Sequence, residues 1–233
     1  MTSVTVEVGT PGQQLKLVPG MTTDTTVLDG LDFPTPALAV ADDVADLLFR
    51  EARTIGAFTD QPVTDEELAA VYDLVKWGPT AINTTPLRLL VVRTPEARAR
   101  LSQHVNEGNR DRVLAAPVTL IVASDPGFHL HLPTLAPHAA GLGDALAEQV
   151  EQREQMALTN TLIQFGYLIV GLRAAGLDAG PMAGLDTAGV DAEFFADNGW
   201  KSQLIINVGH REGEGTTRPR AQRLSYEQVS LTV

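Results

Sequence analysis

Residues 143–175 read GDALAEQVEQREQMALTNTLIQFGYLIVGLRAA, and this stretch decides most of the fold. It contains no proline and ends before Gly176, so the pattern predicts one long helix. Such a helix would span ~50 Å at ~1.5 Å per residue, which is longer than a domain of this size needs. Its C-terminal half is apolar on nearly every side, which predicts a buried helix that packs in part against a partner subunit.

On both sides of this helix the sequence mixes helical and strand patterns. Apolar spacing predicts helices at residues 41–55, 95–104 and 109–115. Short apolar runs rich in β-branched residues predict buried strands at Leu87–Arg93, Pro117–Ser124 and Gln203–Val208. A capping box from Thr64 to Glu67 starts a further helix, and Asp186 can cap a short helix through Phe195. This mixture predicts an α+β or three-layer α/β domain.

The composition of the chain excludes several classes of protein. Of its 233 residues, 44% are hydrophobic and 20% are charged, the balance of a globular protein with a large core. The formal net charge of −12 argues against binding to nucleic acid or to an anionic membrane surface. No apolar run approaches the ~20 residues of a membrane span, and no secretory signal is visible. Without cysteine there are no disulfides or thiolates, so we expect a soluble, cytoplasmic protein.

The N-terminal residues 1–40 differ from the rest of the chain. They are rich in Thr, Pro and Gly and hold too few large apolar residues for a core. Before Arg50 there are one Lys and seven Asp or Glu, which supply −6 of the net charge of −12. We interpret residues 1–40 as an acidic arm, or alternatively as a poorly ordered tail, and residues 41–233 as one domain.

Three polar features are candidate sites, and each also has an ordinary structural explanation. Arg53 and Thr54 close the first predicted helix, where an arginine can hold an anion or simply favour the helix dipole. The segment PTAINTTP at residues 79–86 is either a connecting loop or a place where backbone approaches a ligand. The late arginines suit a phosphate, or form a solvated basic tail; they are Arg218, Arg220 and Arg223.

Motifs for other chemistries are missing. There is no phosphate-binding loop ending in Gly-Lys-Ser or Gly-Lys-Thr, no nucleophile elbow and no paired-histidine zinc helix. The one close histidine pair, His129 and His131, has only Asp125 nearby and no recognisable metal-ligand spacing. We therefore expect no metal site.

Taken together and in this order, five elements resemble the nitroreductase family of FMN flavoproteins. They are EARTIGAFTDQPV at residues 51–63, PTAINTTP at 79–86, Asn109 with Arg112, GPMAG at 180–184, and the late arginines. The resemblance runs from about residue 41 to the C-terminus. The elements WGPTAINTTP and GPMAG, with Pro137 and His138, are most similar to the branch named for malonic semialdehyde reductase, which forms 3-hydroxypropionate.

The resemblance implies a role in FMN binding for each matching position. It places Arg53 and Thr54 at the phosphate and ribityl chain, and Asn109 and Arg112 at the polar rim of the ring. It places the loop with Pro79, Thr80, Ala81 and Asn83 under the edge of the isoalloxazine. The backbone of Pro181, Met182, Ala183 and Gly184 would face flavin N5. The phosphate clamp would be completed by Arg220 with Arg223, or by Arg218 with Arg220.

Two positions depart from the family pattern. Gly56 stands where many members carry a second N-terminal arginine, so the phosphate clamp would rely more on the C-terminal tail. Ala183 stands where classical nitroreductases carry a glutamate, which leaves the backbone contact intact and makes substrate choice less certain.

The resemblance also implies an architecture and an activity. The fold would be a three-layer α/β/α sandwich with a central mixed sheet, in a homodimer with swapped C-terminal segments. The activity would be ping-pong hydride transfer from NADH or NADPH through N5 of FMN, because the flavin supplies the chemistry and the protein the orientation. The acceptor would be a small semialdehyde such as malonic semialdehyde, or else a nitroaromatic or quinone. A flavin-binding protein without turnover is the remaining alternative.

Residues 128–143, FHLHLPTLAPHAAGLG, are predicted to form a variable lid loop over the flavin. Within it, His138 can bind the carboxylate of an acidic substrate or donate a proton to its carbonyl oxygen. Alternatively, His138 caps the long helix or faces solvent.

Overall fold

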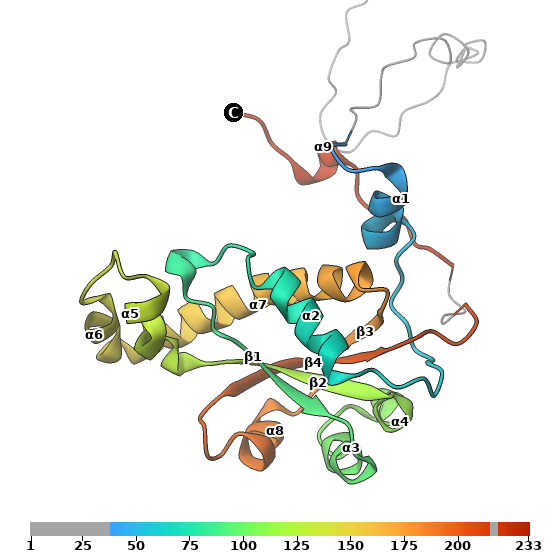
Figure 1. Ribbon diagram of the computed structural model, residues 1–233, viewed down its shortest axis with the longest axis horizontal. Coiled ribbons are helices and arrows are strands. Elements are labelled where there is room, and N and C mark those ends of the chain that lie inside the picture. The colour runs from blue at the N-terminus through green and yellow to red at the C-terminus, as the bar shows by residue number, and fades with distance from the viewer. Residues whose placement is uncertain (1–37, 215–218) are drawn as a thin grey trace, which may run out of the picture. The chain divides into compact units, whose positions relative to one another are not determined.

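A four-stranded sheet lies at the centre of the computed structural model, which describes residues 38–214 and 219–233. Its strands are β1 Leu87–Val92, β2 Val118–Ser124, β3 Asp178–Met182 and β4 Lys201–Gly209, in the spatial order β1-β2-β4-β3 (Figure 1). All three strand pairings are antiparallel. The resemblance implied a mixed sheet, and in the described part of the chain the sheet is antiparallel instead. No residue pattern in the sequence had indicated the direction of the strands.

Three of these strands confirm the sequence prediction, and β3 was missed. Gly180 and Pro181 lie within β3 and both lower strand propensity, so the segment gave no strand signal. Pro181 is tolerated because β3 is an edge strand, where a missing N–H donor breaks no ladder on the outer side.

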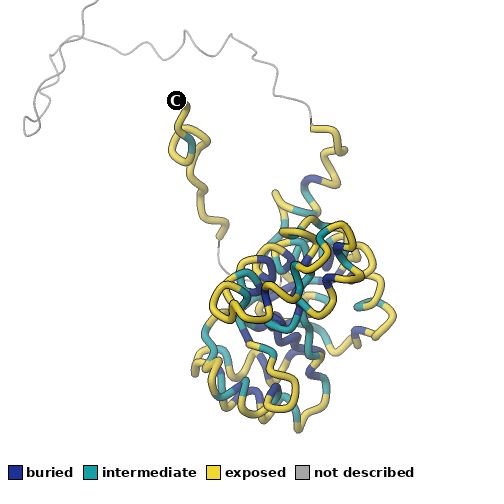
Figure 2. The backbone as a smooth tube through the Cα atoms, turned by 90° about the vertical axis from the view of Figure 1, so that its left-hand side faces the viewer, coloured by how far each residue is buried: buried dark blue, intermediate teal, exposed yellow. Residues whose placement is uncertain are grey.

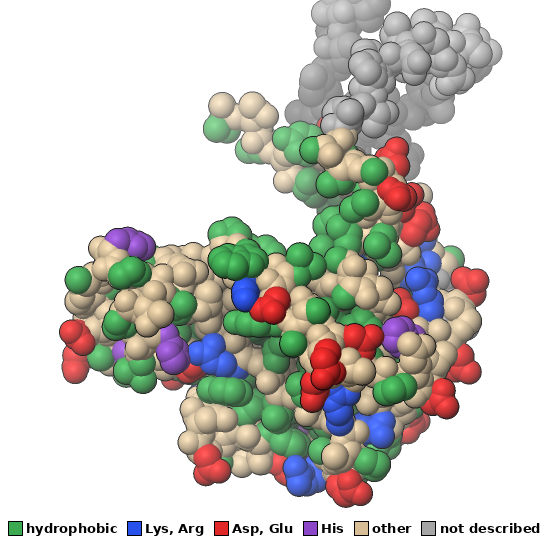
Figure 3. All heavy atoms as spheres, viewed as in Figure 1, with side chains coloured by type: hydrophobic (Ala, Val, Ile, Leu, Met, Phe, Trp, Pro, Cys, Tyr) green, Lys and Arg blue, Asp and Glu red, His purple; other side chains and the backbone are tan. Residues whose placement is uncertain are grey.

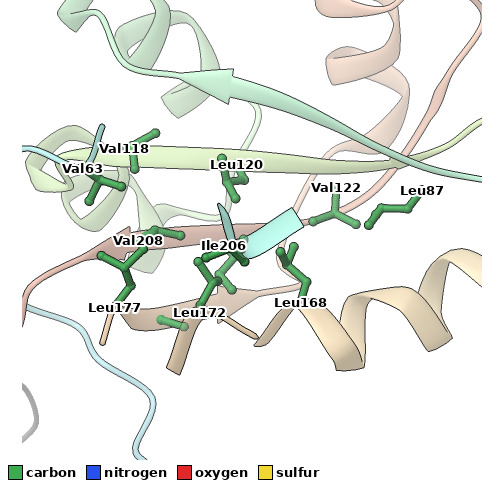
Figure 4. Packing of buried hydrophobic residues seen from close by; sticks show 12 residues of the cluster. Val63, Leu87, Val118, Leu120, Val122, Leu168, Leu172, Leu177, Ile206 and Val208 are labelled. Atoms are coloured by element: carbon green, nitrogen blue, oxygen red, sulfur yellow. The ribbon is translucent and has the colours of Figure 1, made fainter. Parts of the chain in front are cut away.

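Helices cover both faces of the sheet and form three layers with it. On one face lie α2 Asp65–Val75 and α7 Val150–Ala174; on the other lie α3 Pro95–Ser102, α4 Glu107–Ala115 and α8 Thr187–Phe194. Leu120 of β2 packs with Ile206 of β4 and Leu172 of α7 on the first face (Figure 4). The next residue, Ile121, belongs to the cluster on the second face, as the period of two requires.

The start of α2 confirms the predicted capping box. The Thr64 hydroxyl accepts a hydrogen bond from the Glu67 amide at 3.1 Å, and the Glu67 carboxylate accepts one from the Thr64 amide at 2.7 Å. The bond from the Thr64 backbone is the main reason that the pKa of Glu67 lies below its ordinary value. The Asp186 cap of α8 is confirmed as well, by a 3.1 Å bond from the Gly189 amide.

The first helix is shorter than predicted. It consists of α1 Asp42–Ala45 and a π-helical turn, η2 Asp46–Arg50, whose last residue forms ion pairs with Asp42 and Asp46. Beyond it the chain is extended, and the Ile55 amide donates to the Ala179 carbonyl of β3 at 3.0 Å. The burial of Ile55 fits an extended segment as well as a helix, which is why the pattern misled.

The predicted 33-residue helix is two helices, α6 Leu142–Ala147 and α7. Gln149 interrupts them with non-helical angles, φ −105° and ψ 67°. The Arg153 side chain donates to the carbonyls of Leu146 and Ala147, so it replaces helix bonds at the end of α6. A break stabilised by a side chain further along gives no Gly or Pro signal in the sequence.

The predicted lid loop is folded. Residues 126–135 form η4 Pro126–His131 and α5 Leu132–Leu135, and α6 follows after a turn. Phe128, Leu132 and Ala136 pack with Leu146 and Ala157 in a third hydrophobic cluster against α7. A core of this kind is inconsistent with a free-standing loop.

The chain ends beyond β4 in an exposed tail, residues 219–233, which contains the short helix α9 Tyr226–Val229 (Figure 2). The acidic arm predicted for residues 1–40 lies outside the described residues, apart from its last three positions. In the portion that is described, no helix has the length and apolar character needed to cross a membrane.

Candidate functional site

A cavity of about 1040 Å³ opens between the extended segment after η2 and the C-terminal tail. Among the described residues it gathers six arginines onto one surface of an acidic protein: Arg50, Arg53, Arg112, Arg173, Arg220 and Arg223. Two carboxylates, Glu212 and Glu214, also line it. We call this cavity the arginine cleft. Such a concentration of guanidinium groups suits a ligand with a doubly charged anionic end.

The arginine cleft brings together five of the predicted site residues: Arg53, Thr54, Arg112, Arg220 and Arg223. The Arg220 guanidinium donates to the Ala52 carbonyl at 2.9 Å, which ties the C-terminal tail to the segment that carries Arg53. Arg50 is already held by Asp42 and Asp46, so its charge is largely compensated. Arg218, the third late arginine of the prediction, lies outside the described residues.

Arg173 is a member of the arginine cleft that the sequence analysis missed. It lies in the last turn of α7, is half-buried, and donates from Nη1 to the Leu48 carbonyl at 2.8 Å. Burial lowers the pKa of its guanidinium, and the nearby charge of Arg220 lowers it further. The sequence signal that could have found it is that Arg173 is the one charged residue in the mainly apolar C-terminal half of α7.

The predicted segment at residues 181–184 lies next to the predicted Asn109. Pro181 and Met182 end β3, and Ala183 and Gly184 follow it. The Gly184 carbonyl accepts a bond from the Asn106 amide at 3.0 Å, and a Cβ at Gly184 would lie 3.1 Å from Asn109 Nδ2. A side chain at Gly184 would crowd Asn109, so Asn109 and the segment after β3 lie next to each other.

The predicted loop at residues 79–86 is conformationally strained. Ile82, Asn83 and Thr85 have φ values of 53°, 54° and 38°, in the left-handed region that side chains with a Cβ rarely adopt. Strain of this kind persists only where the surroundings enforce it, and it concentrates at functional sites. We call residues 79–86 the strained loop.

Polar side chains of α7 fix the backbone around the strained loop. Tyr167 donates its hydroxyl to the Pro79 carbonyl at 3.1 Å. The Asn160 and Gln164 side-chain oxygens accept from the amides of Ala81 and Leu87, at 2.7 and 3.0 Å. A Cβ at Gly78 would lie 2.3 Å from the Tyr167 ring, so the chain can pass there only as glycine. The sequence signal was polar residues at positions 160, 164 and 167, on one face of an apolar helix.

A partly buried ion pair holds the other end of the strained loop. Arg88 lies 2.6 Å from Asp125, with 22% and 12% of the two side chains exposed. Arg88 also donates to the Thr85 carbonyl, while Asp125 accepts from the Gly127 amide and so starts η4. This ion pair therefore joins the strained loop to the segment that carries α5.

The strained loop and the arginine cleft lie at different places on the chain. Asn160 holds the strained loop, and Arg173 lines the arginine cleft. Thirteen residues separate them on α7, and a helix rises ~1.5 Å per residue, so the two are ~20 Å apart. A single copy of the chain does not bring Thr80, Ala81 or Asn83 to the arginine cleft.

The remaining candidates are histidines near α5. His138 lies exposed in the turn between α5 and α6. Asn83 of the strained loop donates to the Leu135 carbonyl of α5, so this turn and the strained loop are on the same side of the domain. His129 contacts the Pro126 carbonyl, and no cluster of three or more metal-binding side chains occurs among residues that the structure describes.

Comparison with known proteins identifies the family of this chain. Residues 49–210 match the model of the Nitroreductase family. A Streptomyces coelicolor protein provisionally described as an NADH dehydrogenase/NAD(P)H nitroreductase is 52% identical over 188 residues, which are 81% of this chain and 95% of that protein. The chain belongs to the nitroreductase family. A Leptothrix cholodnii relative with the same description is 49% identical over 77% of this chain and 91% of its own length.

Solved nitroreductase-family structures share the fold. One from Bacillus subtilis has a TM-score of 0.69 and 20% identity, over 82% of this chain and 99% of its own. Another, from Exiguobacterium sibiricum and described as a complex with FMN, has a TM-score of 0.68 and 17% identity, over 84% of this chain and 100% of its own. The narrower resemblance to malonic semialdehyde reductases remains a prediction.

Proposed function

We propose that this nitroreductase-family chain is an FMN-dependent oxidoreductase that takes a hydride from NADH or NADPH. The observation that carries the proposal is the arginine cleft, where guanidinium groups from separate segments converge beside Thr54. A phosphate monoester is close to doubly charged at neutral pH and offers three acceptor oxygens, which matches such a set of donors. Relatives about half identical to this chain are described as NAD(P)H nitroreductases, which supports the choice of reductant.

The residues present fit the cofactor, and each group has a distinct task. Arg53, Thr54, Arg220 and Arg223 would hold the phosphate end. The backbone from Met182 to Gly184, with Asn109, would bind the polar parts of the ring, and Arg112 would place positive charge near it. FMN, when bound, supplies the hydride transfer that the side chains of this chain cannot perform. The chain supplies binding, orientation and exclusion of water.

We further propose that the active form is a homodimer in which the partner's strained loop completes the site. In one chain the strained loop does not line the arginine cleft, and Asn160, which holds it, lies ~20 Å along α7 from Arg173. Hydrophobic side chains reach the surface on the face that carries α2 and α7 (Figure 3), including Leu74, Trp77, Leu162 and Ile163. The C-terminal tail exposes Leu224, Tyr226, Val229 and Leu231, as a segment that crosses to a partner would.

The decisive experiment is a titration of the purified chain with FMN, followed by absorbance and by the fluorescence of the flavin. We expect one FMN per subunit and a dimer mass by light scattering. Protein that stays colourless with excess FMN would contradict the cofactor, and a flavin-loaded monomer would contradict the shared site.

As acceptor we propose a small aldehyde that bears a carboxylate, such as malonic semialdehyde. The exposed His138, near the strained loop, is available to bind the carboxylate or to donate a proton to the carbonyl oxygen. The provisional descriptions of the relatives favour a second class, nitroaromatic compounds, with quinones beside them.

Separate measurement of the two half-reactions distinguishes these acceptors. Stopped-flow absorbance follows reduction of the flavin by NAD(P)H, and reoxidation is then timed with an aldehyde, a nitroaromatic and a quinone. We expect His138→Ala to slow only the aldehyde step. No turnover of malonic semialdehyde by the wild type would move the assignment to a nitro or quinone acceptor. A flavin that NAD(P)H cannot reduce would indicate a binding protein.

A further inference from the structure

Arg173 differs from the other cleft arginines in the element that carries it. It belongs to the last turn of α7, one residue after the fully buried Leu172, whereas Arg53, Arg220 and Arg223 lie on extended segments. Its position is therefore set by the packing of α7 against the sheet. Its bond to the Leu48 carbonyl fixes the guanidinium beside the turn that leads to Arg53.

The charge of Arg173 is poorly compensated within the described chain. No carboxylate among the described residues lies within ion-pair distance of it, although Glu212 and Glu214 line the same cleft. Asp178, the carboxylate that interacts with it at longer range, is engaged by the Arg211 guanidinium at 3.4 Å and the Arg211 amide at 2.9 Å. Its neighbour Arg220 is another cation, and both burial and this neighbour lower the pKa of Arg173. Arg173 and Arg220 line the same cleft, so an anion bound there would reduce the repulsion between their charges.

The hydrogen bond to the Leu48 carbonyl uses only part of the donor capacity of the Arg173 guanidinium. A guanidinium has five N–H donors, and the bond to the Leu48 carbonyl uses one nitrogen, Nη1. It is the one hydrogen bond that Arg173 makes to the described residues. The remaining donors belong to a side chain that lines the arginine cleft, where a ligand can reach them.

Gly56 lines the arginine cleft and contributes no side chain to it. A Cβ at Gly56 would lie 3.8 Å from the Arg112 guanidinium carbon, so a basic side chain there would project toward another cation. The N-terminal segment therefore leaves room at this position for the Arg112 side chain.

We propose that Arg173 binds the phosphate of FMN together with Arg220, and so supplies a cation to the cleft from the buried helix α7. The inference rests on the proposed cofactor. It adds to the site a residue that is built into the core, which would make part of the phosphate clamp rigid before the ligand arrives.

The test compares FMN with riboflavin, which has the same ring and ribityl chain but no phosphate. Dissociation constants of both are measured by fluorescence quenching for the wild type, Arg173→Met and Arg173→Lys. The control is Arg100→Met, which removes an exposed arginine of α3 that pairs with Glu193 and does not line the arginine cleft. Unfolding by urea reports whether each variant is folded.

We expect Arg173→Met to weaken FMN binding about 10-fold to 150-fold, the effect of losing a hydrogen bond to a charged group. Riboflavin binding should stay within about twofold, Arg173→Lys should lie between, and Arg100→Met should match the wild type for both ligands. Because a phosphate monoester gains its second charge near pH ~6, the rise in FMN affinity from pH 5 to 7 should also be smaller in Arg173→Met.

Two results would overturn the inference while leaving the cofactor assignment intact. Equal weakening of FMN and riboflavin would show that Arg173 acts through the fold around Leu48. Unchanged FMN affinity would show that it has no part in binding. Wild-type protein that binds neither flavin would refute the proposed function itself, and this inference with it.

Discussion

In the arginine cleft the polar groups are charged ends of long side chains from several segments, whereas in the strained loop they are backbone groups fixed by buried side chains. Arg220 reaches the cleft from a tail in which nearly every residue is exposed. Asn160 and Gln164, which hold the strained loop, are 3% and 4% exposed. From this difference we expect changes in the cleft to alter ligand affinity with little effect on folding, and changes around the strained loop to lower the stability of the fold.

The largest effect on stability is expected from the Arg88–Asp125 ion pair beside the strained loop. Replacing Arg88 by Met leaves the Asp125 carboxylate partly buried without its cation. Loss of one partner from a buried pair costs about 3–5 kcal/mol, and the partial exposure of both groups places the expected loss in the free energy of unfolding near ~3 kcal/mol. Urea denaturation measures it.

The double variant Arg88→Met with Asp125→Asn is the control for that prediction. It removes the stranded charge and should recover part of the lost stability. A single variant as stable as the wild type would remove the basis for treating the strained loop as a structural region.

The second effect concerns the α7 side chains that hold the strained loop. Gln164→Leu leaves the buried Leu87 amide without an acceptor, which should lower the free energy of unfolding by about 1–3 kcal/mol. Gln155→Leu changes an exposed amide on the same helix, so it should have an effect within about 0.5 kcal/mol. Equal effects in the two variants would mean that helix propensity, and not the held backbone, determines the result.

The third prediction concerns the arginine cleft, where ligand affinity should change and stability should not. Arg53→Ala and Arg220→Ala should each weaken FMN binding about 10-fold to 150-fold while changing the free energy of unfolding by less than about 0.5 kcal/mol. Isothermal titration and urea denaturation on the same samples give both quantities. Wild-type affinity in both variants would mean that the phosphate end lies elsewhere.

The smallest effect is expected at Glu67, a charged residue outside both the arginine cleft and the strained loop, and it concerns stability. Hydrogen bonds lower the pKa of Glu67 in the folded state, so it contributes stability above its usual value of 4.5 and loses it as the pH falls through the lowered value. The advantage of the wild type over Glu67→Gln should therefore be present at pH 7 and shrink in acid. Urea denaturation from pH 3 to 7 follows it, and a constant difference would assign the effect to side-chain size.

Patterns that depend on neighbouring residues predicted this fold well. The capping box at Thr64 and the strands that became β1, β2 and β4 follow from local spacing, because side-chain periodicity and caps are local properties. The helix after Gly143 was predicted as unbroken, because the Arg153 side chain that ends α6 acts from a distance along the chain. Tertiary contacts likewise decided the end of the first helix and the folding of residues 126–135.

The site was predicted in parts. Arg53, Thr54, Arg112, Arg220 and Arg223, which come from distant segments, line one cleft, and their roles in binding a flavin remain predictions. Arg173 and the side chains that hold the strained loop were missed, since their partners are main-chain groups of other elements. The sequence does not show which backbone carbonyl or amide a distant side chain will bind.

The contact between Gly78 and Tyr167 gives the order in which these two positions can change during evolution. Any larger residue at Gly78 would overlap the Tyr167 ring, whose atoms lie 2.3 Å from the place of a Cβ. A lineage can therefore enlarge position 78 only after position 167 has become smaller, and that first step removes the hydroxyl that binds the Pro79 carbonyl. The two residues should therefore vary together among descendants of this chain. Any route to a larger residue at position 78 passes first through a variant that has lost Tyr167.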